Sequence, residues 1–213
     1  MIEIFHIPDI EEMIKNNLIE IGDGAKIDTG VWLCHWVESG EVKKVKIGKN
    51  CKIRTGTVIY GDVEIGDNVN FGQHVVVREG CRIGDNSSIG TGVKVENDTI
   101  IGHHTSIETQ SHVTANAIIG NYVFWGACVV SNNDFGMKYK RQGHGQGLLG
   151  CICKDYSRIG SNAILMAGVM IGEHSIINAG ETVRKDVPAK TLFFTKKGKE
   201  IYKKIKPEAI NEK

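Results

Sequence analysis

Two histidines occupy positions from which an imidazole could act as a general base. His103 lies at an expected turn, two residues after the apolar Ile101, and His112 immediately precedes Val113. Both side chains are therefore expected to face outward. An imidazole with a pKa of about 6.5 can take a proton from an attacking hydroxyl or amine near neutral pH. A surface histidine is more commonly solvated and idle, so the surrounding residues must decide between these interpretations.

A six-residue repeat positions these histidines. Every sixth residue is apolar along the run Ile47, Ile53, Ile59, Ile65, Phe71, Val77, Ile83, Ile89, Val95, Ile101, Ile107, Val113, Ile119 and Trp125. The residue two positions before each is small or β-branched, and both point the same way because alternate strand residues share a face. Three hexads complete one coil, and coils stack at about 4.8 Å. Such a period predicts an all-β solenoid with triangular coils.

Breaks in the repeat divide the chain. The solenoid is expected over residues 21–190, with loop insertions at 34–44 and 132–157. Residues 1–20 are predicted to form a strand and helix that cap the first coil, because solenoid ends need covering. Residues 191–213 form a basic C-terminal tail, in which Ile201, Tyr202 and Ile205 could line one face of a short helix.

The two insertions differ in what they suggest. Trp36 in the first could stack on a flat ring such as a nucleotide base, or could cover the end of the core. The second is longer than the roughly 12–15 residues usual for structureless loops, which favours a functional loop.

With this repeat, the chain resembles the hexapeptide-repeat, left-handed parallel β-helix acyltransferases, and within them the sugar-nucleotide N-acetyltransferase branch. Two segments carry the closer resemblance. Val123-Phe124-Trp125-Gly126-Ala127-Cys128, followed by Ser131-Asn132-Asn133-Asp134, is similar to the pattern V-F-x-G-P-x-x-x-F-T-N-D. Val183-Arg184-Lys185-Asp186-Val187-Pro188 matches V-x-K-D-V-P.

The resemblance implies an activity and an assembly. We expect acetyl-CoA-dependent N-acetylation of a nucleotide-linked amino sugar, in a homotrimer whose active sites lie between two β-helices. The catalytic candidates are His112, His103, Asn133 and Asp134. His112 should lie within about one coil of the long loop. The chain departs from the family pattern at Ala115, where some relatives carry the base, and at Thr109, where some carry an asparagine.

Cofactor contacts are expected at small residues in the later turns and at two lysines. The candidates are Trp125, Ala127, Ala167, Gly168, Ala179, Gly180, Lys185 and Lys196. A small residue lets a ligand approach backbone amides, although turns also favour small residues for their own sake. The lysines could meet the coenzyme's phosphates as point charges.

Other functions remain open on sequence grounds. O-acetylation of a sugar or a xenobiotic is the nearer alternative. A metal hydratase like the γ-class carbonic anhydrases, which share the β-helix, would need three convergent histidines. Gln110 stands two coils after His74, however, and His103, His104 and His112 occupy different sides of the coil, so we expect no metal. A non-catalytic scaffold is the third alternative.

Composition adds few constraints. The formal net charge of +1 gives no nucleic-acid or membrane signal. No apolar run reaches the roughly 18 residues of a membrane span, and no signal-peptide pattern is present, which predicts a cytoplasmic protein. Cys51 and Cys81 occupy small inward positions, while Cys34, Cys151 and Cys153 are placed in the insertions. Free thiols are favoured over disulfides or zinc ligands.

Overall fold

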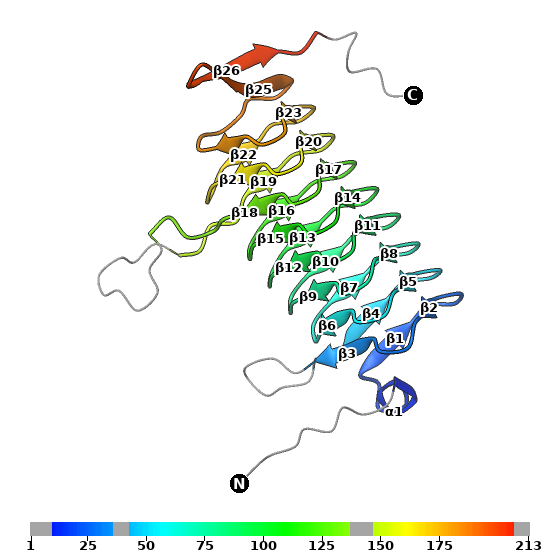
Figure 1. Ribbon diagram of the computed structural model, residues 1–213. Coiled ribbons are helices and arrows are strands. Elements are labelled where there is room, and N and C mark those ends of the chain that lie inside the picture. Colours follow the sequence, from blue (N-terminus) through cyan, green and yellow to red (C-terminus); the bar gives the residue numbers. More distant parts are fainter. Residues whose placement is uncertain (1–9, 36–42, 137–146, 207–213) are drawn as a thin grey trace.

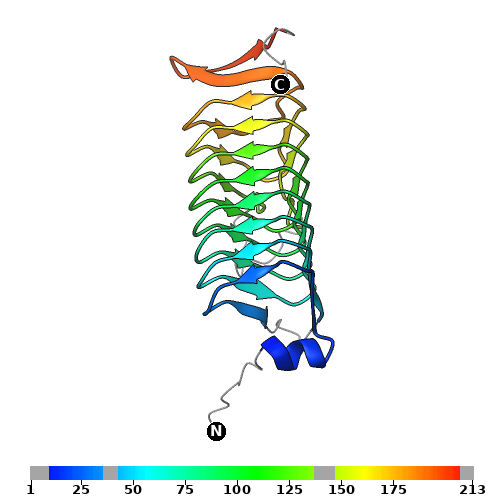
Figure 2. The ribbon, with the colours of Figure 1, turned by 90° about the vertical axis from the view of Figure 1, so that its right-hand side faces the viewer.

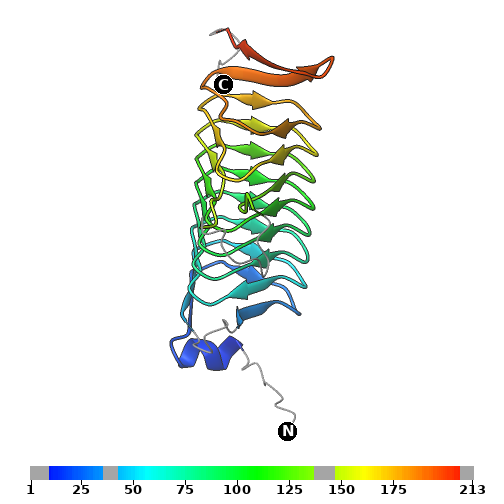
Figure 3. The same cartoon turned by 90° about the vertical axis from the view of Figure 1, so that its left-hand side faces the viewer.

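A computed structural model describes residues 10–35, 43–136 and 147–206. In this part the chain winds into a three-sided parallel β-helix (Figure 1), so the expected β-helix is confirmed. We call the three sheets faces 1, 2 and 3, in the order in which the chain meets them, and name each corner by the faces that it joins. Figures 2 and 3 show the strands stacked coil upon coil along the axis.

The helix and strands have the following bounds. Face 1 contains β1 (Ile19–Ile21), β4 (Val45–Ile47), β7 (Glu64–Ile65), β10 (Arg82–Ile83), β13 (Ile100–Ile101), β16 (Ile118–Ile119), β19 (Ile152–Cys153) and β22 (Met170–Ile171). Face 2 contains β2 (Lys26–Ile27), β5 (Lys52–Ile53), β8 (Asn70–Phe71), β11 (Ser88–Ile89), β14 (Ser106–Ile107), β17 (Phe124–Trp125), β20 (Arg158–Ile159), β23 (Ile176–Ile177), β25 (Thr191–Lys196) and β26 (Lys199–Lys204). Face 3 contains β3 (Trp32–His35), β6 (Val58–Tyr60), β9 (Val76–Val77), β12 (Lys94–Val95), β15 (His112–Val113), β18 (Val130–Ser131), β21 (Ile164–Leu165) and β24 (Thr182–Val183). The helix α1 spans Ile10–Lys15.

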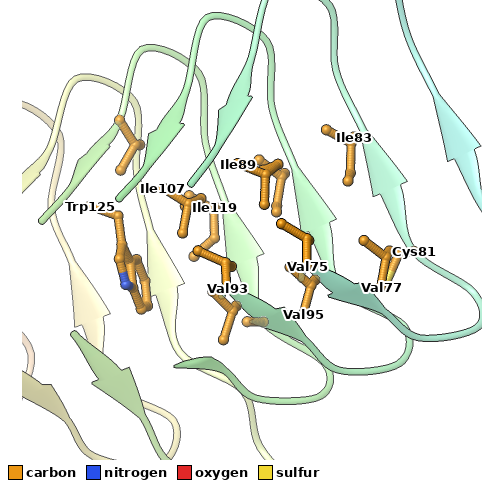
Figure 4. Close-up of a cluster of buried hydrophobic side chains, with 14 of the residues drawn as sticks. Val75, Val77, Cys81, Ile83, Ile89, Val93, Val95, Ile107, Ile119 and Trp125 are labelled. Atoms are coloured by element: carbon orange, nitrogen blue, oxygen red, sulfur yellow. The ribbon is translucent and has the colours of Figure 1, made fainter. Parts of the chain in front are cut away.

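The hexad pattern sets the register and fills the bore. Ile83 pairs with Ile101, and Ile89 with Ile107, so residues one coil apart lie side by side. Ile89, Ile107 and Trp125 point into the space that the strands enclose (Figure 4), and each is at most 1% exposed. Burying this apolar row is the main favourable term for the fold.

Several hydroxyls at the small inward positions form hydrogen bonds, whereas that of Ser157 has no partner among the described residues. Ser87 Oγ donates to the Gly102 carbonyl and Thr105 Oγ1 to the Gly120 carbonyl, both at 2.8 Å. These bonds offset the cost of burying a polar group. The corners need left-handed backbone, which asparagine tolerates better than most residues. Asn68 and Asn86 accordingly adopt φ values of 58° and 57° at corner 1–2.

The long insertion ends earlier than the sequence analysis predicted. β19 pairs in register with β16, Ile119 opposite Cys153. Cys151 and Cys153 are 0% and 1% exposed and fill the bore like other inward residues. The predicted bound at 157 is therefore wrong, and the repeat already resumes at Cys151.

The first insertion also begins later than predicted. β3 continues to His35, and Cys34 is 5% exposed with its thiol donating to the Leu18 carbonyl at 3.1 Å. Trp36 lies outside the described residues, so neither interpretation of it is tested. All six cysteines are free thiols.

Both ends of the bore are covered. At the N-terminal end, Met13 of α1 is 3% exposed and packs with the first coil. At the other end, β25 stacks on β23, with Phe193 opposite Ile177, and then pairs antiparallel with β26. Figure 2 shows this hairpin closing the top of the stack. The short helix predicted for the tail is wrong, because Phe193 is drawn into the core and Tyr202 packs across the hairpin against it.

Candidate functional site

His112 is held by a carboxylate from the coil below. Its Nε2 lies 2.8 Å from Glu96 Oε1, and Glu96 Oε2 accepts the Ala115 backbone N–H at 3.0 Å. The hydrogen bond to His112 lowers the pKa of Glu96, which is therefore ionised near neutral pH. An ionised carboxylate only accepts, so Nε2 must carry the proton and Nδ1 a lone pair. That lone pair belongs to the neutral form of the imidazole, and among the described residues Nδ1 has no hydrogen-bond partner. The pair has the arrangement of a base and its orienting group.

A buried hydroxyl pair supports the strand that carries His112. Ser131 stands where the repeat otherwise places a large apolar residue. Its Oγ accepts the Thr114 backbone N–H at 2.9 Å and lies 2.9 Å from Thr114 Oγ1. Ser131 is 1% and Thr114 8% exposed. A side chain thus takes over a ladder hydrogen bond at the coil from which the long loop departs.

The base of the loop meets this region at corner 3–1. Asn133 Nδ2 donates to the Ala115 carbonyl at 3.5 Å, and the Asn133 carbonyl accepts the Leu149 N–H at 2.8 Å. Asp134 Oδ1 accepts the Gly136 N–H at 2.8 Å, which fixes the first turn of the loop. The structure thus brings Asn133 close to the turn that His112 and Glu96 share, while Asp134 points its oxygen at the loop backbone.

An apolar strip leads from His112 toward the C-terminal coils. On face 3, His112 is followed in register by Val130, Ile164 and Thr182. Val130 is 37% and Ile164 39% exposed. Two corners flank this strip, and they carry most of the predicted cofactor residues.

The predicted cofactor residues fall into two groups. Ala127, Ala179 and Gly180 lie at corner 2–3, with the last two exposed and Ala127 half-buried. Gly168 and Lys185 lie at corner 3–1 and are exposed. Gly168 has φ of +70°, and the side chains of Phe135 and Leu149 stand 3.5–3.6 Å from where its Cβ would be. Lys196 is exposed at the end of β25.

Two of the predicted cofactor residues are corrected. Trp125 is 0% exposed, because it occupies the large inward position of its hexad and fills the bore. Ala167 is 1% exposed and offers no side-chain surface. A motif match does not take into account which positions of the repeat point inward. Trp125 occupies one of these inward positions.

His103 lies elsewhere, at corner 1–2. Its Nδ1 is 2.9 Å from His104 Nδ1, and its ring meets the Tyr122 ring edge-on at 5.1 Å between centroids. Beyond it runs an aromatic column in which His104, Tyr122, Tyr156 and His174 stack successively at 4.7–4.8 Å. The structure therefore does not bring His103 together with His112.

The sequence analysis missed Glu96. It follows the inward Val95, and His112 precedes the inward Val113 one coil later. Glu96 and His112 are separated in the sequence by two residues fewer than one full coil. They therefore lie diagonally opposite each other on neighbouring coils of face 3. That spacing was a usable signal.

The described residues contain neither a candidate metal cluster nor a candidate membrane-spanning helix. They contain no group of three histidine, cysteine or acidic residues that could hold a metal ion. None of their helices is long and apolar enough to cross a membrane.

Comparison with known families places the repeat. The model "Bacterial transferase hexapeptide (six repeats)" matches residues 44–79, and "Hexapeptide repeat of succinyl-transferase" matches residues 62–97 and 155–185. The hexapeptide repeat is thus matched over residues 44–97 and 155–185 of the chain. A curated protein similar to part of the chain, the bifunctional protein GlmU of Prochlorococcus marinus (strain NATL2A), is 49% identical over 41 residues. That match spans 19% of the chain and only 9% of the relative.

Solved structures extend the likeness to the whole fold. The UDP-N-acetylglucosamine acyltransferase from Campylobacter jejuni superposes with a TM-score of 0.73 at 17% identity, over 89% of this chain and 71% of that chain. The Francisella novicida UDP-N-acetylglucosamine acyltransferase gives 0.66 at 19% identity, over 89% and 72%. At these identities the likeness is one of fold.

Proposed function

We propose that the protein is an acyl-CoA-dependent acyltransferase that N-acetylates an amino group of a nucleotide-linked amino sugar. The observation that carries the proposal is the His112–Glu96 pair at the foot of the apolar strip on face 3. The hexapeptide repeat of bacterial transferases supports acyl transfer. The fold likeness to UDP-N-acetylglucosamine acyltransferases supports a nucleotide-linked acceptor.

In the proposed reaction His112 is the general base. The acceptor amine attacks the thioester carbonyl of acetyl-CoA, and His112 Nδ1 takes the amine proton as the C–N bond forms. Glu96 stabilises the imidazolium that results, since its carboxylate already accepts the Nε2 proton. The tetrahedral intermediate then collapses, expelling the CoA thiolate, and the imidazolium returns its proton to the sulfur. Backbone amides at the corner would hold the oxyanion.

Acetyl-CoA would lie along face 3. Its pantetheine arm would follow Val130 and Ile164, with Gly180 at one flanking corner letting the ligand approach backbone. The exposed Lys185 and Lys196 would meet the phosphates. The proposal specifies only the order of these contacts along the axis of the β-helix.

The proposal includes a cytoplasmic homotrimer that packs through face 1. The upper half of this face presents Ile100, Ile118 and Met170, which are 48%, 45% and 36% exposed. The long loop leaves corner 3–1, beside face 1, so it would reach the neighbouring subunit. An exposed aliphatic row of this kind marks an interaction surface.

The test is acetyl transfer to UDP-linked amino sugars, followed by release of the CoA thiol. His112→Asn should lower kcat by about 100-fold or more with little change in KM, and Glu96→Gln should lower it less. His103→Asn, at the other corner, is the matched control and should retain the wild-type rate.

Three results would count against the proposal. An unchanged rate in His112→Asn would remove the base. Acetylation of a hydroxyl analogue in preference to the amine would replace N- by O-acetylation. Absence of detectable acetyl-CoA binding would favour a non-catalytic scaffold.

A further inference from the structure

A groove on face 2 collects positive and polar side chains away from the His112–Glu96 pair. It encloses about 600 Å³, within the range of small-ligand sites. Its lining at corner 2–3 includes Arg54, Gln73, Thr91 and Thr109. Lys52 projects from β5 at its lower end, and no acidic residue lines it. The groove is open on one side and therefore accessible to a ligand.

The lysines at the lower end of this groove lack compensation. Lys26 and Lys52 are register neighbours on adjacent strands, where like charges repel. Neither lysine has an ion-pair partner in the described part of the chain. Arg54 Nη1 stands 3.8 Å from Asp28 Oδ2, a long contact at a half-exposed side chain. An anion between these groups would remove the repulsion.

In the corresponding coils on face 1, side chains of opposite charge follow one another in register and compensate each other. There Glu20, Lys46, Glu64 and Arg82 follow one another in register. Lys46 Nζ lies 3.1 Å and Arg82 Nε 3.6 Å from Glu64. The same coils thus carry alternating charges on the strands of face 1, whereas the strands of face 2 carry only Lys26 and Lys52, with Asp28 beside Arg54 at the corner. The imbalance is local to the groove rather than general to the chain, whose net charge is +1.

Polar groups continue the groove upward to the turn before His112. Thr91 Oγ1 donates to Gln73 Oε1 at 2.8 Å, which leaves the Gln73 amide nitrogen as a donor toward the groove. Thr109, the uppermost lining residue, precedes His112 by three positions. From Lys52 to this level is three coil steps, roughly 14 Å. In Figure 1 the strands β5, β8, β11 and β14 follow one another along this face.

We propose that Lys52 and Arg54 hold the phosphate groups of the acceptor, a nucleoside-diphosphate-linked sugar, whose sugar end lies toward Thr109 and His112. Guanidinium and ammonium groups are the usual protein partners of phosphate, the guanidinium through paired N–H donors. The identity of the ligand as acceptor rests on the proposed acyl transfer. The anion site itself rests on the groove and its charges alone.

The experiment measures binding of inorganic pyrophosphate and of UDP to the full chain by titration calorimetry. Wild type should bind both, more weakly as salt rises because exposed charges are screened. Lys52→Met combined with Arg54→Met should weaken UDP binding by about 10-fold or more. Lys46→Met, in the same coil on face 1, should bind UDP as wild type does. Coenzyme A should bind the double variant normally.

The outcomes separate this proposal from the acyltransferase itself. If the double variant binds UDP as strongly as wild type, or if wild type does not bind UDP, the proposed phosphate site in the groove is wrong. Binding through Lys52 and Arg54 without any acyl transfer leaves the groove standing and refutes the acyltransferase. Acetyl transfer that depends on His112, with the same acceptor KM in the double variant, refutes the groove and leaves the acyltransferase standing.

Discussion

Glu96 is the residue on which the proposed chemistry of His112 depends. Its carboxylate spans two coils, bonding the imidazole with one oxygen and the Ala115 N–H with the other. The pair therefore orients the base and ties it to the turn beneath the loop. Glu96→Gln removes the charge while keeping the shape, and its single amide oxygen can accept only one of these two hydrogen bonds. The variant therefore tests both roles at once.

The lowered pKa of Glu96 predicts a pH-dependent contribution to stability. A carboxylate with a depressed pKa stabilises the fold above its unfolded pKa, and the effect is lost as pH falls through the folded value. Wild type should exceed Glu96→Gln by about 1 kcal/mol or less at pH 7, since the pair is partly exposed. Denaturant titrations from pH 7 to pH 3 should show this difference shrinking below about 4.5. A difference that persists unchanged at the acid end contradicts the prediction.

Ser131 acts on His112 through the backbone. In Ser131→Ala the buried Thr114 N–H loses its acceptor, which should cost roughly 1–3 kcal/mol. We expect kcat to fall while the acceptor KM stays near wild type. Ser157→Ala is the matched control, because Ser157 is also fully buried at an inward position but its Oγ has no partner in the described structure. Equal stability losses in the two variants would contradict a special role for Ser131.

At the scale of elements, the hairpin β25–β26 serves as a lid on the bore. Phe193 is fully buried and Phe194, its neighbour, faces the other way and is only half-buried. Phe193→Ala should therefore lower the free energy of unfolding by about 3–5 kcal/mol, as expected for a large cavity in a core. Phe194→Ala should cost clearly less. Thermal and denaturant unfolding of both variants measures the contrast, and similar losses would show that the hairpin does not close the core.

The sequence predicted these elements unevenly, for physical reasons. The inward residues from Ile47 to Trp125 were predictable because one apolar side chain in six must fill the bore. Cys151 and Cys153 obey the same rule, but their thiols were interpreted as part of an insertion, and the loop was drawn too long. The tail's apolar spacing suited a helix equally well, and only stacking on β23 favours a strand.

Within the site, the prediction was limited by contacts between coils. The outward direction of His112 follows from its place before Val113, and the structure keeps it there. Its bond to Glu96 joins neighbouring coils, so it can be predicted only by applying the coil spacing to the two residues and not from a motif within one coil. The assignment of Trp125 to the cofactor site is wrong for a different reason. It followed the motif match, although the position of Trp125 in the repeat already predicted an inward side chain.

At the scale of the whole molecule, face 1 changes character halfway along the axis. Its lower coils carry the ion pairs around Glu64 and its upper coils the aliphatic row from Ile100 to Met170. A subunit partner would bury the upper half, whose strands β13, β16, β19 and β22 carry no charged residue.

Ile118→Lys should therefore disrupt the proposed trimer without unfolding the chain. Ile118 is 45% exposed, so a lysine there is tolerated in a single subunit but not in a contact. Ile176→Lys, on face 2 at 38% exposure, is the control and should leave the assembly intact. Sedimentation or light scattering measures the mass. A wild-type monomer, or a trimer in Ile118→Lys, contradicts packing through face 1.

Because every coil repeats the one beneath it, the distance between two sites on the surface is set by the number of coils between them. Excising or duplicating one complete hexad triplet between Lys52 and His112 would keep every strand in register and every inward side chain inward. The change would nevertheless move Lys52 by one coil rise, roughly 4.8 Å, relative to the His112 imidazole. If Lys52 and His112 hold the two ends of the acceptor as proposed, the length of acceptor that fits would change in discrete steps without redesign of either end.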